Sequence, residues 1–247
     1  MAEDVWLVGD VQGYCSVLSR LLRESGLIDH SGQWTGGSAT LVVAGDLVDR
    51  GPDGVGVIQL LMDLQLQGGH VRVVIGNHDV QLLAAHRFGG SMVDAWLDAG
   101  GVREDLERLT SEHVEWLSNL PALSLIDHTL VVHADAMFYT AYGSTPGAVN
   151  ARVREVLSSA NLSEWQLLLE RFGEHRAFFG ANGEANLAQF LTTFGGERLV
   201  HGHTPIARML GIPPASVTSA YVYRDGRCVN VDPGIYLGGP GFSHLLD

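Results

Sequence analysis

A unit that occurs three times in the N-terminal half of the chain constrains the fold most. Each unit is a short apolar run, a Gly-Asp or Gly-Asn pair, and then apolar residues at helical spacing. The apolar runs occupy residues 5–8, 41–44 and 71–75, and the helical patterns follow near residues 17–22, 57–64 and 82–85. Strands that alternate with helices predict a parallel or mixed sheet covered by helices. The polar loops after these strands should therefore meet at one edge of the sheet, where such proteins bind ligands.

The rest of the chain predicts further helices and two strand pairs within a single domain, residues 1–247. A helical cap is expected at about 91–120 and a helical insert at about 148–194. The runs 123–126 and 130–132 flank a tight turn, and residues 221–223 and 228–231 form a closing hairpin. With 46% hydrophobic residues, the 247-residue chain can bury a substantial core.

The net charge, the cysteine positions and the hydrophobic segments limit which binding partners and which cellular compartment are expected. The formal net charge of −13 repels nucleic acid, so no stable nucleic-acid binding is expected. Cys15 and Cys228 lie far apart without a CxxC pair, which argues against a disulfide framework or a thiolate zinc site. No basic leader begins at Met1 and no segment has the length of a membrane span, so a cytoplasmic location is expected.

Five short segments carry the chemistry: GDVQG (9–13), GDLVDRG (45–51), GNHD (76–79), VVHAD (131–135) and HGHT (201–204). Any one of them has about even odds of being only a turn or a helix cap. All five follow apolar strands and offer oxygen or imidazole ligands, which turn chemistry does not explain. Together they predict one polar site.

The residue types fit a pair of divalent ions about 3.5–4 Å apart, which needs a bridging carboxylate and further ligands on each side. Asp46 suits the bridge and Asp10 the first ion, while Asn77, His133 and His203 suit the second. Oxygen and imidazole ligands together favour manganese, iron or zinc over calcium. We expect two divalent ions, with manganese preferred.

The five segments resemble the signature of the calcineurin-like metallophosphoesterases, and within them the phosphoprotein phosphatase branch, which includes bacterial serine/threonine phosphatases and symmetrical diadenosine tetraphosphatases. The resemblance spans Asp10 to Thr204. It implies an α/β sandwich of two mixed sheets stacked face to face and flanked by helices. It also implies a hydroxide shared by the metal ions as the nucleophile, Arg50 as a phosphate-binding residue, and His78 as a general acid oriented by Asp49.

One position departs from the family pattern, because Gln12 replaces the histidine of GDxHG. Its amide oxygen is a weaker, neutral ligand for the first metal, or a hydrogen-bond partner of a metal-bound water. A second phosphate-binding arginine is usual in the branch. Arg176 is preferred here over the alternatives, which are Arg152, Arg154, Arg171 and Arg198.

Other residues near the motifs have less defined roles. His201 should face the same side of its strand as His203, and Tyr236 lies in a glycine-rich segment like one that closes the site in bacterial members, so both are candidate substrate contacts. Asp79 is expected to orient a neighbouring imidazole, with a helix cap as the alternative, and the role of Asp135 stays open.

The sequence thus predicts a metal-dependent hydrolase of phosphate esters or phosphoanhydrides. Its substrate is a nucleotide or other phosphorylated small molecule, a dinucleoside polyphosphate, or a phosphoprotein. The alternative is a catalytically weak relative that binds phosphate or a partner protein. Retention of Arg50, His78 and every second-metal ligand argues against that alternative, since a binding module needs no general acid.

Overall fold

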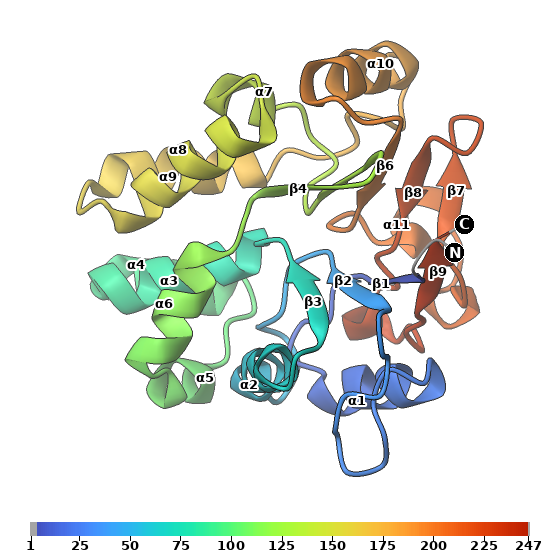
Figure 1. Ribbon diagram of the computed structural model, residues 1–247. Coiled ribbons are helices and arrows are strands. Elements are labelled where there is room, and N and C mark those ends of the chain that lie inside the picture. Colours follow the sequence, from blue (N-terminus) through green and yellow to red (C-terminus); the bar gives the residue numbers. More distant parts are fainter. Residues whose placement is uncertain (1–3, 247) are drawn as a thin grey trace.

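The computed structural model describes residues 4–246, so the start of the chain at Met1, used above to argue against a leader, lies outside it. The three N-terminal apolar runs form neighbouring parallel strands in a four-stranded sheet of order β3-β2-β1-β9 (Figure 1). The C-terminal strand β9, which the sequence analysis did not foresee, pairs antiparallel with β1. The bounds are β1 Val5–Val8, β2 Thr40–Val43, β3 His70–Val73 and β9 His244–Leu246.

The second sheet has five strands in the order β4-β5-β6-β8-β7. Its three central strands, β5, β6 and β8, are parallel. The edge strands β4 and β7 pair antiparallel with β5 and β8, which confirms the two predicted strand pairs. The bounds are β4 Leu123–Ile126, β5 Thr129–Val132, β6 Arg198–His201, β7 Tyr221–Tyr223 and β8 Cys228–Asn230.

The two sheets pack against each other through small apolar side chains that alternate along the strands. One buried cluster joins Leu7 and Val42 of the first sheet to Val131, Val200 and Val229 of the second. Their sequence neighbours point the other way, into a larger cluster shared with the flanking helices. Both faces of the central strands are therefore buried, which is why these strands read as continuous apolar runs. The predicted sandwich of two mixed sheets is confirmed.

Helices cover the outer faces of the sandwich and form a group beside it (Figure 1). Helices α4 to α6 occupy the segment predicted as a cap, and α8 to α10 occupy most of the predicted insert. No helix within residues 4–246 is both long and apolar enough to cross a lipid bilayer. The bounds are α1 Cys15–Glu24, α2 Gly54–Leu66, α3 Asn77–Phe88, α4 Gly90–Asp98, α5 Arg103–Arg108, α6 Ser111–Asn119, α7 Tyr139–Tyr142, α8 Pro146–Ser158, α9 Leu162–Phe172, α10 Gly183–Phe194, α11 Ile206–Leu210, and the 3₁₀ turns η1 Pro214–Ser216 and η2 Ile235–Leu237.

Candidate active site

The five motif segments meet at the carboxyl edge of the two sheets, as their positions after strands predicted. Their loops are tightly wound: several non-glycine residues adopt the left-handed backbone region that side chains rarely occupy. Such strain persists where the surrounding structure enforces it and is typical of functional sites. The site residues concerned are Gln12 (φ 45°), Asp46 (φ 51°), Asp49 (φ 71°), Arg50 (φ 61°), Arg176 (φ 63°) and His203 (φ 66°).

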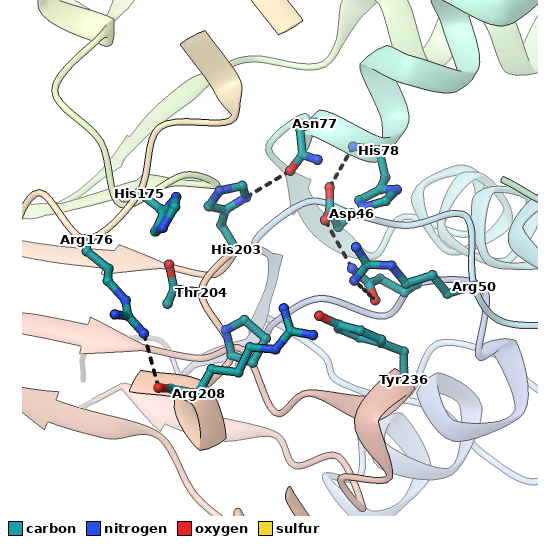
Figure 2. A pocket seen from close by; sticks show the side chains of 12 residues that line it. Asp46, Arg50, Asn77, His78, His175, Arg176, His203, Thr204, Arg208 and Tyr236 are labelled. Atoms are coloured by element: carbon teal, nitrogen blue, oxygen red, sulfur yellow. Dashed lines mark hydrogen bonds between the residues drawn. The ribbon is translucent and has the colours of Figure 1, made fainter. Parts of the chain in front are cut away.

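The three predicted second-metal ligands converge on one point, and Figure 2 shows two of them, Asn77 and His203. The Asn77 Oδ1 atom lies 2.9 Å from both His133 Nε2 and His203 Nδ1, and these two nitrogens are 3.2 Å apart. His133 Nδ1 donates to the carbonyl oxygen of Ala44 at 2.8 Å, so its Nε2 presents a lone pair. Burial lowers the pKa of His133, and burial together with His133 lowers that of His203 to about 3, which keeps both rings neutral.

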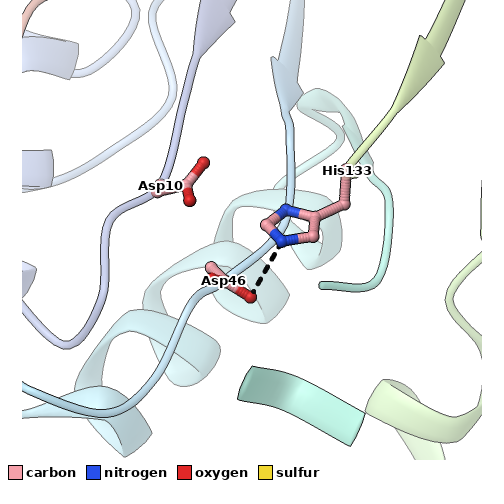
Figure 3. Close-up of side chains that lie close together, drawn as sticks. All are labelled: Asp10, Asp46 and His133. Carbon is pink, nitrogen blue, oxygen red and sulfur yellow. Dashed lines mark ion pairs between the residues drawn. The ribbon is translucent and has the colours of Figure 1, made fainter. Parts of the chain in front are cut away.

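Two carboxylates face this cluster from the first sheet. One ligand atom from each of Asp10, Asp46 and His133 lies within 4.8 Å of the others, and Figure 3 shows His133 Nε2 against Asp46 Oδ1, 3.2 Å apart. The Asp10 oxygens accept from the backbone N–H of His203 at 3.1 Å. Asp79 accepts three backbone N–H bonds, including one from Asp46 at 3.1 Å. Asp79 therefore shapes the loop that carries Asp46 and does not orient an imidazole.

This donor set fits divalent cations. Lone-pair atoms of an amide, two imidazoles and two carboxylates face one another in a buried space, and the neutral rings supply too few protons to pair them. Buried polar atoms normally have hydrogen-bond partners, so an arrangement of facing acceptors calls for a positive charge between them. Asp10, Asp46, Asn77, His133 and His203 are the residues that would hold it.

Gln12 makes two hydrogen bonds that place it between Asp46 and Arg50. Its Oε1 accepts from Arg50 Nη1 at 3.0 Å, and its Nε2 donates to Asp46 Oδ2 at 3.2 Å. The amide oxygen thus faces the guanidinium of Arg50, a contact that the sequence did not predict. Coordination of a metal by Gln12 stays a prediction.

His78, Asp49 and Trp96 form a buried chain of hydrogen bonds. His78 Nδ1 lies 2.7 Å from Asp49 Oδ2, and Trp96 Nε1 donates to Asp49 Oδ1 at 2.8 Å. Burial opposes the charged imidazole, but the carboxylates of Asp46 and Asp49 outweigh it and raise the pKa of His78. The ring is fixed with Nδ1 toward Asp49, which leaves Nε2 as the atom available to a ligand, and His78 lines the pocket.

The predicted cap lies behind this chain and does not roof the site. Trp96 is the one buried residue of α4, and the carbonyl oxygen of Gly100 accepts the backbone N–H of Arg50 at 2.8 Å. None of the described residues 91–120 lines the pocket. The helices of this segment instead hold Asp49 and Arg50 from outside.

The pocket above the metal-ligand cluster has a volume of about 220 Å³ and a cationic rim. Arg50, Arg176 and Arg208 all line it, and the centroid of the Tyr236 ring lies 3.9 Å from Arg50 Cζ and 5.6 Å from Arg208 Cζ (Figure 2). Arg176 Nη2 donates to the backbone oxygen of Arg208 at 3.1 Å. Of the arginines weighed from sequence, Arg176 is the one that lines the pocket.

Asp135, whose role the sequence left open, positions Arg176. Its Oδ2 accepts the backbone N–H of Arg176 at 2.8 Å and its Oδ1 accepts the hydroxyl of Thr204 at 2.6 Å. One carboxylate thereby ties the loop after β5 to the insert and to the loop after β6. The bond between Asp135 and Thr204 joins residues 69 positions apart in the sequence.

The placement of His201 does not support a substrate contact. The ring is fully buried, with Nδ1 at 2.9 Å from the Gly202 oxygen and Nε2 at 2.8 Å from the Tyr223 hydroxyl. Strand β6 ends at His201 and His203 has a positive φ, so the alternation that placed both histidines on one side stops between them.

Four residues at the site had no assigned function from sequence: His175, Trp96, Arg208 and Asp232. His175 and Arg208 line the pocket beside predicted residues. Nothing local marks His175, Trp96 or Arg208, whereas the position of Asp232 directly after an apolar strand is a signal that could have found it. The Asp-Pro-Gly segment beginning at Asp232 was read only as part of a glycine-rich rim.

A two-sheet sandwich with a carboxylate, amide and imidazole cluster at its edge and arginines above it defines a metal-dependent phosphoesterase class. The chain belongs to the calcineurin-like phosphoesterase family, whose model matches residues 4–207. The resemblance stated from the motifs is thereby confirmed.

Among curated proteins, it is similar to a symmetrical bis(5'-nucleosyl)-tetraphosphatase of Ralstonia nicotianae, with 31% identity over 176 residues, covering 69% of this chain and 54% of the relative. It is also similar to serine/threonine-protein phosphatase 1 of Salmonella typhimurium, with 37% identity over 109 residues, 44% of this chain and 43% of the relative. The matches thus span about half the length of these relatives.

A solved structure shows the same fold. The cold-active protein-tyrosine phosphatase of a psychrophilic Shewanella superposes with a TM-score of 0.77 at 24% identity, covering all of this chain and 76% of that one.

Proposed function

We propose that the chain is a two-metal hydrolase of phosphate esters or phosphoanhydrides. The observation that carries the proposal is the convergence of Asn77, His133 and His203 on one point beside Asp46, with Arg50 and His78 facing the same pocket. Bound divalent ions lower the pKa of water towards neutrality and so supply the nucleophile. Manganese suits the mixed oxygen and imidazole set, with iron or zinc as alternatives.

The side chains divide the remaining work. Arg50 presents a planar guanidinium that pairs with two phosphoryl oxygens and offsets their charge in the transition state. Gln12 aligns Arg50 through its 3.0 Å hydrogen bond. His78, held by Asp49, donates a proton to the leaving oxygen from Nε2. Phosphoryl transfer to water then needs no phosphorylated side chain.

The rim favours a substrate with more than one phosphate. Arg50 contacts Gln12 next to the metal ligands, whereas Arg176 and Arg208 lie together on the rim formed by the insert and α11. Arg50 and Arg176, the second phosphate-binding arginine expected from the sequence, satisfy one phosphoryl group beside the metal ions, so the guanidinium of Arg208 suits an additional phosphate of the same substrate. A cavity of about 220 Å³ accommodates a phosphate chain but leaves attached nucleosides outside. A dinucleoside polyphosphate is therefore the preferred substrate, and a cytoplasmic location fits it.

The second candidate is protein dephosphorylation, favoured by the open rim and by the Salmonella relative named as a serine/threonine-protein phosphatase. The two candidate functions are distinguished by measuring how fast manganese-loaded protein hydrolyses diadenosine tetraphosphate, phosphoserine and phosphotyrosine peptides, and p-nitrophenyl phosphate. We expect the dinucleotide to have the highest kcat/KM and Asp46→Asn to abolish all turnover.

Arg208→Ala should lower kcat/KM for diadenosine tetraphosphate by about tenfold or more, equivalent to one charge-assisted hydrogen bond of about 1.5–3 kcal/mol, and leave p-nitrophenyl phosphate nearly unchanged. Arg23→Ala, at an exposed position on α1, is the matched control. A preference for phosphopeptides, or equal losses on both substrates, would reject the polyphosphate assignment. Metal binding without turnover of any substrate would instead support the catalytically weak relative.

A further inference from the structure

The strand ends that build the site follow a regular pattern. Each sheet contributes three parallel strands to it, β1, β2 and β3 from one and β5, β6 and β8 from the other. Five of these strands are followed, within four residues of their last position, by a predicted metal ligand: Asp10, Asp46, Asn77, His133 and His203. The sixth strand, β8, ends at Asn230, and Asp232 stands two residues beyond it, the same offset as that of Asp10 from β1.

Asp232 lies directly against the loop of Asp10. A Cβ atom on Gly9 would overlap the carbonyl oxygen of Val231 and lie 3.0 Å from the backbone nitrogen of Asp232, so only glycine allows this approach. The backbone oxygen of Asp232 accepts the N–H of Ile206 at 3.2 Å, which ties it to the segment following His203. Asp232 is thus placed between the loops that carry two metal ligands.

The carboxylate of Asp232 is buried and incompletely bonded. The residue is 1% exposed; its Oδ1 accepts the Gly234 N–H at 2.8 Å, while Oδ2 has no hydrogen-bond partner among the described residues. A buried carboxylate oxygen without a partner is costly and calls for a cation.

The first-metal side lacks a charged or imidazole ligand where Gln12 stands, and the Gln12 oxygen faces Arg50. We propose that Asp232 is a further carboxylate of the metal centre, which holds the first ion together with Asp10. The proposal rests on the metal centre of the proposed function and not on the identity of the substrate. A carboxylate in this place supplies the negative charge that the neutral amide does not.

Metal binding tests the proposal without reference to activity. Metal-stripped wild type, Asp232→Asn and Asp105→Asn are titrated with Mn²⁺, and free Mn²⁺ is followed by electron paramagnetic resonance. Asp105 is a matched control because it is also buried and accepts backbone N–H bonds, but its partners Gly54 and Val55 begin α2 and are not next to a predicted metal ligand in the sequence. We expect Asp232→Asn to lower the affinity for one of two Mn²⁺ ions by about tenfold to a hundredfold. Asp105→Asn should bind both ions with wild-type affinity.

Thermal unfolding provides the second readout. Because an uncompensated buried charge is removed, Asp232→Asn should unfold in the metal-free state at the wild-type temperature or above, yet gain less from added Mn²⁺. Asp232→Ser, which keeps an acceptor for Gly234, is the second variant if the amide disturbs folding. Wild-type affinity for both ions in the folded variants would overturn the proposal. A wild type that binds a single ion would refute the two-ion prediction, and unchanged affinity for that ion would refute the role of Asp232.

Discussion

Removing the Asp49 carboxylate tests whether His78 works as a general acid. Asp49→Asn keeps the shape of the side chain but replaces the charged acceptor that lies 2.7 Å from His78 Nδ1. Asp49 is fully buried, so solvent does not substitute for the lost charge. The imidazole then loses both its fixed orientation and the stabilisation of its protonated form.

The expected loss follows from these contacts. A hydrogen bond to a charged group contributes about 1.5–3 kcal/mol, which corresponds to a decrease in kcat of about 10- to 150-fold. Removal of the acid itself in His78→Ala should cost about 10²- to 10⁴-fold, the usual contribution of general acid catalysis. Trp96→Phe removes a donor to the Asp49 carboxylate but leaves the contact between Asp49 and His78 in place, so it should lower kcat less than Asp49→Asn does.

The assay compares p-nitrophenyl phosphate with phenyl phosphate, whose leaving group needs a proton more. All three variants should lose more activity on phenyl phosphate than on p-nitrophenyl phosphate, with manganese content measured in each. Equal losses on both esters at full metal occupancy would refute the general-acid assignment, because a proton donor acts on the leaving group alone.

Further predictions concern parts of the molecule away from His78. Asp135→Asn should raise KM more than it lowers kcat, because Arg176 loses its backbone anchor, and steady-state kinetics beside Arg176→Ala will show whether the two changes are non-additive. Asp105→Ala should lower the free energy of unfolding by about 1–3 kcal/mol for each of the two backbone N–H groups left unpaired at α2, measured by urea denaturation. Burial raises the pKa of Cys228 to about 12, so little of this thiol is ionised at pH 8. Iodoacetamide should therefore label the half-buried Cys15 first in the folded protein, and both thiols after unfolding. Rapid labelling of Cys228 in the folded protein would contradict this.

The sequence specified the framework because its signals are local. An apolar run that ends in Gly-Asp predicts both where a strand ends and which side chain follows it. Because the strands are parallel, their ends lie at one edge of the sheet. This logic was sufficient for the first sheet and for bringing Asp10, Asp46, Asn77, His133 and His203 together, whereas the second stacked sheet was expected only from the family resemblance. It missed β9, whose three residues at the chain end are too few to show alternation.

Tertiary structure decided what each side chain faces. Gln12 meets Arg50, Asp135 anchors Arg176, and α4 lies behind Asp49, and each of these contacts joins residues more than 35 positions apart. His201 was misplaced because the left-handed turn at His203 ends the alternation of the strand. Strand ends are encoded within a few residues, whereas side-chain partners depend on how two sheets and their helices stack. Asp232 shows both: its place after β8 is written in the sequence, but its unpaired oxygen and its nearness to the Asp10 loop exist only in the fold.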